Sequence, residues 1–260
     1  MQKEFDEIMK NKMVLSTILL MPLVFSVLVP MAMILPIAFA GDTFTSVNNT
    51  TQSMGGISGL PAMNSQIDLI GFLVNALLPF FMMLPAMLPI IISSYSIIGE
   101  KKNRTLEPLL AAPVSVYEIM IGKALSAMIP ALLATWISAL IFMVLSETIV
   151  KTTLNAWIMP DVLTWLVSLL LLAPLLAFLG ILFSLVISSR VNDPRVAQQV
   201  SVVILLPLIG LFMLQFNGLI LINTQYEFLL LVIVLIVDAV ALQIRNVMFD
   251  REEILTRWKS

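Results

Sequence analysis

The sequence predicts an all-α integral membrane protein with six transmembrane helices, and three observations support this fold class. Hydrophobic residues make up 60% of the 260 residues, charged residues make up 12%, and the mean hydropathy is +1.03. A soluble domain carries about 25% charged residues and could not bury this much apolar surface. Apolar runs of about eighteen residues or more recur, which indicates helices, since barrel strands would alternate polar and apolar residues.

The first twelve residues predict a short amphipathic helix lying on the membrane surface. Phe5, Ile8 and Met9 are spaced so that they share one helical face, and charged residues occupy the remainder. A frayed polar terminus is the alternative. The first span is predicted for residues 13–40, where prolines are tolerated as kinks. Residues 41–66 are rich in Gly, Ser, Thr and Asn and predict a loop.

Five further spans follow, separated by polar or charged segments. These spans are predicted for residues 67–98, 124–146, 162–188, 197–221 and 228–244. The second span exceeds about 20 residues, so we expect it to tilt, to kink or to extend beyond the bilayer. Trp157 is typical of a residue at the membrane–water interface. A brief polar loop, residues 223–227, precedes the sixth span, and all six spans belong to a single transmembrane domain, residues 1–260.

The placement of Lys and Arg predicts the orientation of the chain. In the six-span arrangement, thirteen of the fourteen cations lie on one side and only Lys151 lies on the other. The thirteen are Lys3, Lys10, Lys12, Lys101, Lys102, Arg104, Lys123, Arg190, Arg195, Arg245, Arg251, Arg257 and Lys259. Because cytoplasmic loops carry an excess of positive charge, we expect both termini in the cytoplasm and a multi-pass location in the plasma or inner membrane.

The composition and motifs argue against an enzyme. There is no Cys and no His, which removes thiolate chemistry, the commonest metal ligand and the commonest general base. The sequence contains no Gly-x-x-x-x-Gly-Lys-Ser/Thr phosphate loop, no His-Glu-x-x-His and no Gly-x-Ser-x-Gly. We therefore expect no catalytic, cofactor-binding or metal-binding residues in this chain, and no nucleic-acid partner.

One ionisable residue lies deep within a predicted span. Asp238 stands eleven residues after Glu227 and seven before Arg245, which places it near mid-depth at about 1.5 Å per residue. A carboxylate in lipid is costly, so it faces protein or water. It could belong to a substrate or ion path, or it could anchor two helices by a hydrogen bond. Gln215 and Asn217 of the fifth span are candidate partners in this polar site.

The segment 99–123, between the second and third spans, is charged at both ends and mildly apolar in the middle. Ser115, preceded by Pro-Val and followed three residues later by Glu118, forms a capping box that opens a helix running into the third span. A second short helical piece is predicted near residues 105–112. A solvated basic loop is the alternative, but it does not require the ordered Thr-Leu-Glu, Pro-Val-Ser and Gly-Lys elements found here.

At these residues the sequence resembles the permease subunits of type-2 ABC exporters. The family carries Glu, then Thr-Leu-Glu, two leucines, Pro-Val-Ser, and Gly-Lys entering the next helix. Asn103 and Arg104 stand where many members have glycine. The matching residues are Glu100, Thr105, Leu106, Glu107, Leu109, Leu110, Pro113, Val114, Ser115, Gly122 and Lys123.

The resemblance implies that this segment, with Glu118, forms a cytoplasmic coupling helix in a groove of a separate ATP-hydrolysing subunit. Two such ABC ATPase subunits, which would hold ATP and Mg²⁺, and a second permease, a copy or a paralogue, are the implied partners. A second cytoplasmic contact is expected at Arg190, Asp193 and Arg195. The function implied is outward transport driven by ATP hydrolysis on the partner.

Two alternatives remain open from the sequence. A secondary transporter would work without ATP, and it typically shows several intramembrane charges and a repeat between its halves. A non-transporting membrane scaffold or assembly subunit would need no path across the membrane. Association with an ATPase distinguishes the exporter from both.

Overall fold

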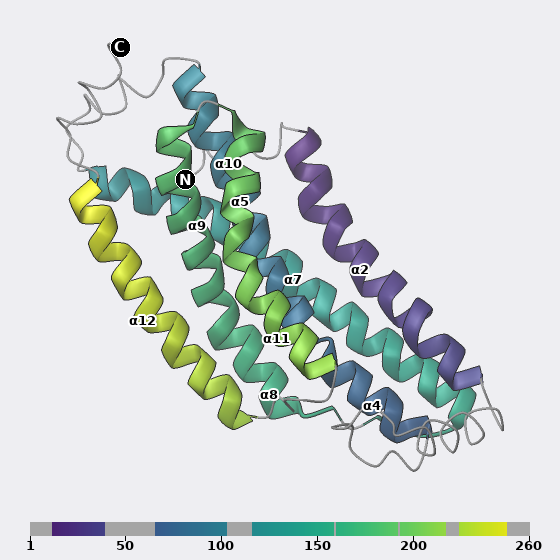
Figure 1. Ribbon diagram of the computed structural model, residues 1–260. Helices are drawn as coiled ribbons and strands as arrows, with labels where there is room; N and C mark the ends of the chain where they lie inside the picture. Colours follow the sequence, from purple (N-terminus) through teal and green to yellow (C-terminus); the bar gives the residue numbers. More distant parts are fainter. Residues whose placement is uncertain are drawn as a thin grey trace.

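The computed structural model describes residues 12–39, 66–102, 116–158, 160–191, 193–216 and 224–248. In these ranges the regular elements are helical and no strand occurs, as the sequence predicts (Figure 1). The α-helices are α2 (Lys12–Phe39), α4 (Gln66–Ala76), α5 (Leu78–Lys102), α7 (Val116–Leu154), α8 (Val162–Val167), α9 (Ala173–Arg190), α10 (Pro194–Ser201), α11 (Leu206–Phe216) and α12 (Thr224–Met248).

Six helical stretches are long and apolar enough to cross a membrane, which confirms the predicted class. They are Leu15–Phe39, Gln66–Ser96, Ala124–Leu154, Val162–Ser188, Pro194–Gln215 and Thr224–Gln243. Three of them join two α-helices: α4 with α5, α8 with α9 through a π-helix at Ser168–Leu172, and α10 with α11 through a 3₁₀ turn at Val202–Leu205. The predicted amphipathic helix near the N-terminus and the predicted helix near residues 105–112 lie outside the described residues.

Successive spans run in opposite directions, so the bundle has two chemically different ends. The basic end, uppermost in Figure 1, carries the C-terminal ends of α5, α9 and α12 and the starts of α7 and α10. The opposite end, here called the Lys151 end, carries the end of α7 and the starts of α4, α8 and α12. Within the described helices Lys151 is the one cation at its end, whereas Lys12, Lys101, Lys102, Lys123, Arg190, Arg195 and Arg245 lie near the other.

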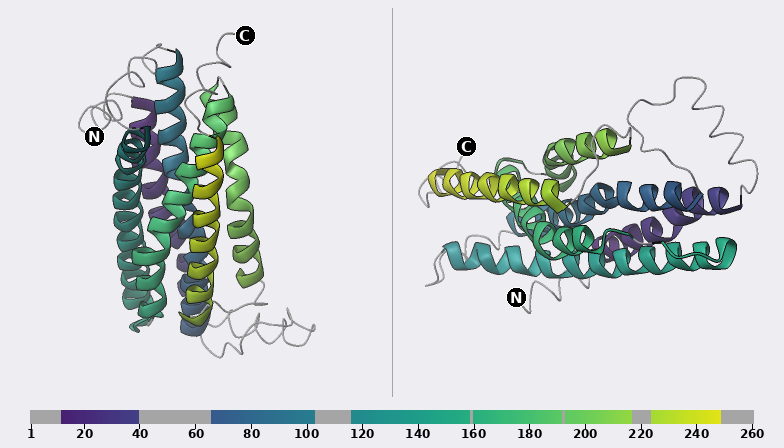
Figure 2. Two further views of the ribbon diagram at one scale, coloured as in Figure 1. Left: turned by 90° about the vertical axis from the view of Figure 1, so that its left-hand side faces the viewer. Right: turned by 90° about the horizontal axis from the view of Figure 1, so that it is seen from below.

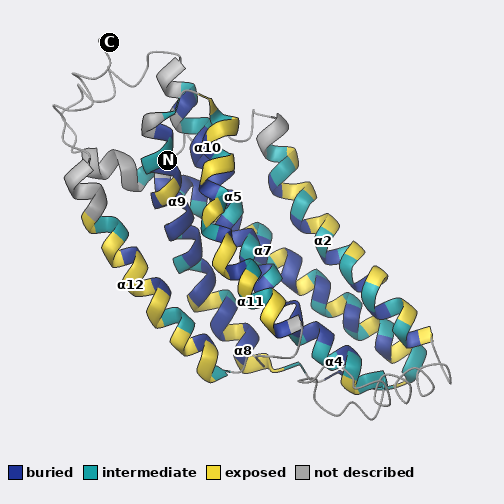
Figure 3. Cartoon of the chain, in the orientation of Figure 1, coloured by how far each residue is buried: buried dark blue, intermediate teal, exposed yellow. Residues whose placement is uncertain are grey.

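The centre of the bundle is formed by α5 and α9, which are buried over most of their length, whereas α12 and α2 expose much of their surface (Figure 3). Three hydrophobic clusters follow one another along the bundle. Ile34, Phe81, Phe142 and Trp165 belong to the cluster at the Lys151 end, and the middle cluster joins α5, α9, α11 and α12. The third cluster, which includes Ile181, lies near the basic end.

Close approach of α5 and α9 depends on one glycine. A Cβ atom on Gly180 would lie 2.4 Å from the carbonyl oxygen of Ala86 and 3.3 Å from Cγ1 of Ile90. Small residues let membrane helices approach at the backbone, where van der Waals packing and interhelical hydrogen bonds hold them together. One turn further along, the hydroxyls of Ser94 and Ser184 lie 3.0 Å apart. The two helices therefore pack as a closely joined central pair.

Among the described helices α7 is the longest, with 39 residues in one continuous element (Figure 2). At about 1.5 Å per residue it spans about 58 Å, well beyond the roughly 30 Å of a hydrocarbon core. The third span is predicted to end at residue 146, and the helix continues to Leu154 because residues 147–154 include no helix-breaking Gly or Pro. The same helix begins at Val116, before the apolar span starts at Ala124.

Candidate functional site

The predicted coupling segment is held between the ends of two long helices at the basic end. Glu100 lies in the last turn of α5, while Glu118, Gly122 and Lys123 lie in the first turns of α7. The intervening part of the predicted site, residues 103–115, lies outside the described residues. That part holds Thr105, Leu106, Glu107, Leu109, Leu110, Pro113, Val114 and Ser115.

The second predicted contact lies at the same end, in the turn between α9 and α10. Arg190 is the last residue of α9, and Asp193 caps α10, its Oδ1 accepting a hydrogen bond from the backbone N–H of Arg195 at 2.9 Å. Pro194 follows at the first helical position, where its missing N–H costs nothing. α10 packs against both α5 and α9, and the Arg195 side chain is exposed. The residues of the expected second contact therefore lie at a capped helix start.

Asp238 is buried on α12, and the structure does not bring it to Gln215. Its side chain is 5% exposed, and neither carboxyl oxygen has a hydrogen-bond partner among the described residues. Gln215 lies near the end of α11, at the level where α12 begins at Thr224, and Asp238 lies fourteen residues, about 21 Å, further along α12. Asn217 lies outside the described residues. The predicted pairing of Gln215 with Asp238 is therefore wrong.

Gln215 instead belongs to a polar cluster at the Lys151 end that sequence reasoning did not assemble. Its Nε2 donates to the backbone carbonyl of Asn75 at 3.0 Å, and Nε1 of Trp165 donates to Oδ1 of Asn75 at 3.3 Å. The backbone N–H of Asp161 donates to the same Oδ1 at 3.4 Å. These bonds tie α4, α8 and α11 together. The sequence offers one hint, a single amide, Asn75, inside a long apolar run.

The cluster extends to α12 through hydroxyl groups. Thr164 and Thr224 place their Oγ1 atoms 3.1 Å apart, and Oγ1 of Thr164 also donates to the carboxylate of Asp161. The Asp161 carboxylate in turn accepts from the backbone N–H of Thr164 and caps α8. Four of the six spans therefore meet in polar contacts at one end of the bundle, where an unsatisfied group in lipid would be costly.

A second buried carboxylate lies on α12. Residues 223–227 are predicted to be a polar loop, whereas α12 begins at Thr224 and buries Glu227, which is 3% exposed, beside Ser168 of the π-helix. Glu227 and Asp238 are eleven residues apart, close to three full turns, so both face α8 and α9. The sequence does not reveal this because an acidic residue at the edge of an apolar run is equally typical of a loop.

Replacing Asp238 with leucine is expected to stabilise the folded chain. A buried carboxyl group without partners costs about 1–3 kcal/mol or more, and leucine has a similar size and no polar atoms. We expect a higher midpoint of thermal unfolding in detergent for Asp238→Leu than for the wild type. The midpoint of Asp238→Asn should lie between these two. Measurement of transport by the same variants separates two roles: a fall in transport despite higher stability assigns Asp238 to a path, and unchanged transport assigns it to packing.

Comparison with known families gives one match. A family model described as ABC-2 family transporter protein matches residues 1–230. The searches of curated proteins and of solved structures found no match. The six membrane-crossing helices and the charge difference between the two ends agree with a membrane transport component. Since the family model covers most of the chain, this protein belongs to the ABC-2 type transporter permease family.

Proposed function

We propose that this chain is the transmembrane permease subunit of an ATP-driven exporter. Hydrolysis of ATP on separate ABC ATPase subunits would drive substrate outward through a pair of permeases. Membership of the ABC-2 permease family supports a transport role and association with ATPase subunits. The observation that carries the coupling proposal is the position of residues 103–115 between Lys102, the end of α5, and Val116, the start of α7.

The helices that hold this segment are suited to transmit a displacement. α7 continues without interruption from Val116 through the membrane to Leu154, so a push at its start moves the whole helix. α5 packs closely on α9 at Gly180, so a displacement of α5 also carries α9 and the Asp193-capped turn. Leu109, Leu110 and Val114 would bury against the ATPase, and Glu107 would position the segment by charge.

The remaining partners follow from the same proposal. Two ATPase subunits, each holding ATP and Mg²⁺, would bind two permeases, and the second permease would be a copy or a paralogue of this chain. The basic end would face the cytoplasm, since cytoplasmic segments are enriched in Lys and Arg. Arg190 and Arg195 would then lie close enough to offer the ATPase a second contact.

Reversal of charge at Glu107 is expected to abolish association with the ATPase. The native complex is purified through a tag on this chain, and the amount of co-purified ATPase is compared with that of Glu107→Arg. We expect at least a tenfold loss, because the carboxylate that orients the segment becomes a repelling cation. Asp68→Arg, the same change on an exposed residue of α4 at the Lys151 end, is the matched control and should retain the ATPase.

Three results would overturn this proposal. One is retention of the ATPase, with normal ATP-dependent transport, by Glu107→Arg. Another is transport by the purified chain reconstituted alone, which would favour a secondary transporter. The third is a chain that binds the ATPase but moves no substrate in the full complex, which would point to an assembly subunit.

A further inference from the structure

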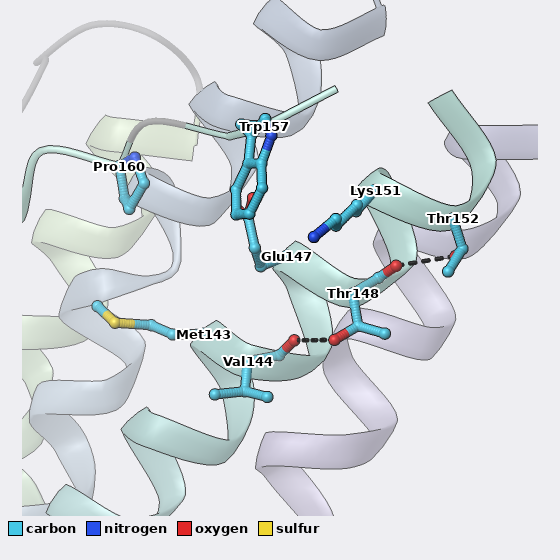
Figure 4. Close-up of a pocket in the computed structure, with 8 residues that line it drawn as sticks. All are labelled: Met143, Val144, Glu147, Thr148, Lys151, Thr152, Trp157 and Pro160. Carbon is cyan, nitrogen blue, oxygen red and sulfur yellow. Dashed lines mark hydrogen bonds between the residues drawn. The ribbon is translucent and has the colours of Figure 1, made fainter. Parts of the chain in front are cut away.

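A groove opens at the Lys151 end of α7, where the chain leaves the helix and returns along it (Figure 4). Its volume is about 570 Å³. Met143, Val144, Trp157 and Pro160 form its apolar wall, and Glu147 and Lys151 lie on the same helical face. The side chains of Lys151 and Trp157 point toward each other across the opening. The groove therefore combines an apolar wall with one positive and one negative group.

The two charged groups are not paired with each other. Nζ of Lys151 lies 4.3 Å from the centre of the Trp157 ring, a cation–π contact that leaves the donor hydrogens available. Oε2 of Glu147 accepts a hydrogen bond from the backbone N–H of Ile158 at 3.3 Å. Oε1 of Glu147 is buried and has no partner among the described residues. A buried carboxylate oxygen without a hydrogen bond destabilises the folded chain until a donor reaches it.

The two threonine hydroxyls of the groove already donate to backbone carbonyls of α7. The hydroxyl of Thr148 donates to the carbonyl of Val144 at 2.6 Å, and that of Thr152 donates to the carbonyl of Thr148 at 2.8 Å. A ligand that satisfies the groove therefore needs an anionic oxygen for Lys151 and a hydrogen-bond-donating cation for Oε1 of Glu147.

An exposed apolar stripe leads from the groove along the surface of α7. Ile129, Leu133, Ile137, Leu140 and Val144 recur every three or four residues on one face, and each is about half exposed or more. From Val144 to Ile129 the stripe is about 22 Å long, more than the roughly 15 Å of one leaflet, which is half of the hydrocarbon core. Glu147 and Lys151 continue the same face beyond the stripe. The charged groups therefore lie where a lipid headgroup would lie.

We propose that this groove binds a phospholipid whose headgroup carries a primary amine, such as phosphatidylethanolamine. The phosphate contacts Nζ of Lys151, and an acyl chain lies along the stripe. The ammonium group donates to Oε1 of Glu147, which it reaches once the exposed Trp157 ring turns away from the carboxylate. A choline headgroup has no N–H to donate, so it leaves the buried carboxylate oxygen without a hydrogen bond. A glycerol headgroup has no positive charge, so it leaves the negative charge of the carboxylate uncompensated.

Native mass spectrometry of the delipidated, detergent-purified chain tests this assignment. Dioleoyl phosphatidylethanolamine, phosphatidylcholine and phosphatidylglycerol are titrated separately, and the fraction carrying one lipid is measured. We expect tighter binding of phosphatidylethanolamine, and about a tenfold or greater loss for Glu147→Gln and for Lys151→Gln, since each removes one charge-assisted hydrogen bond. Arg245→Gln, which removes a cation near the end of α12 at the basic end, is the matched control and should bind like the wild type.

The variants also distinguish the competing occupants. Glu147→Gln should weaken the binding of phosphatidylethanolamine alone. Lys151→Gln should weaken the binding of both phosphatidylethanolamine and phosphatidylglycerol. Equal binding of all three lipids would overturn the proposal. So would binding of soluble phosphorylethanolamine as tight as that of phosphatidylethanolamine. Disulfide cross-linking of two chains through a Thr148→Cys variant in native membranes would also overturn it, because a second copy would then cover the groove. Equal melting temperatures without lipid confirm that the variants are folded.

Discussion

Substitution of Gly180 by alanine is expected to weaken the folded chain strongly, because the added methyl group has no space. Its Cβ would lie 2.4 Å from the carbonyl oxygen of Ala86, and a backbone atom of α5 cannot rotate away as a side chain can. Either α5 and α9 separate or their backbones shift. Overpacking of this kind costs about 1–3 kcal/mol and sometimes more. The loss of stability arises at the contact between α5 and α9, the central helix pair of the bundle.

The matched control for this substitution is Gly210→Ala in α11. No described residue lies within 4 Å of a Cβ built on Gly210, and alanine is a better helix former than glycine, so stability should be unchanged or slightly higher. Unfolding of both variants in mixed micelles, followed by tryptophan fluorescence with increasing denaturing detergent, gives the comparison. Equal midpoints for the two variants would contradict the close α5–α9 packing.

The Gly180 contact also has a consequence for transport. If α5 and α9 move as one body, a variant that loosens them should separate ATP hydrolysis from substrate movement before the fold is lost. The hydroxyls of Ser94 and Ser184, 3.0 Å apart, and the bond from the Ser184 hydroxyl to the carbonyl of Ile90 at 3.3 Å would still join the two helices. Transport per ATP hydrolysed by Gly180→Ala at a temperature where it remains folded should therefore fall below that of Gly210→Ala.

The parts of the fold that the sequence predicts correctly are those set by local properties. A run of about 20 apolar residues crosses a bilayer whatever its neighbours are, so the six spans could be predicted from composition along the chain. The division of cations between the two ends follows from the same spans. The helix start capped by Asp193 was not predicted, although Asp-Pro before a polar run is a local helix-start pattern that could have indicated it.

The contacts between spans could not be predicted in this way. Gln215 donates to Asn75, 140 positions earlier in the chain, and nothing near either residue specifies that pairing. Glu227 is buried because α12 starts earlier than the apolar run does. Gln215 was wrong as a partner for Asp238 for the same reason, since depth in the membrane depends on where each helix begins, and Asn217 stays a prediction. Glu107 and its neighbours lie outside the described residues and stay predictions.

Removal of the indole of Trp165 is expected to produce a large loss of packing at the Lys151 end of the bundle. Trp165 is 1% exposed, and its ring centre lies 5.8 Å from that of Phe81 and 6.0 Å from that of Phe142. In a soluble core, truncation of Trp to Ala costs about 3–5 kcal/mol. Unfolded membrane helices remain in lipid, which is as apolar as the core, so mainly the packing is lost and about 2 kcal/mol is expected.

A pair of variants separates packing from hydrogen bonding at this position. Trp165→Phe retains a ring but removes the Nε1 donor to Asn75, so we expect a smaller loss of about 1 kcal/mol. Trp157→Ala makes the same truncation on a side chain that is 63% exposed, and its midpoint in lipid-free detergent should change little. If Trp165→Ala and Trp157→Ala unfold at the same denaturant level, the aromatic cluster is not what holds α8 against α5 and α7. If Trp165→Phe loses as much stability as Trp165→Ala, the hydrogen bond to Asn75 contributes more than the packing of the ring. The polar cluster would then be the main interaction that stabilises this end of the bundle.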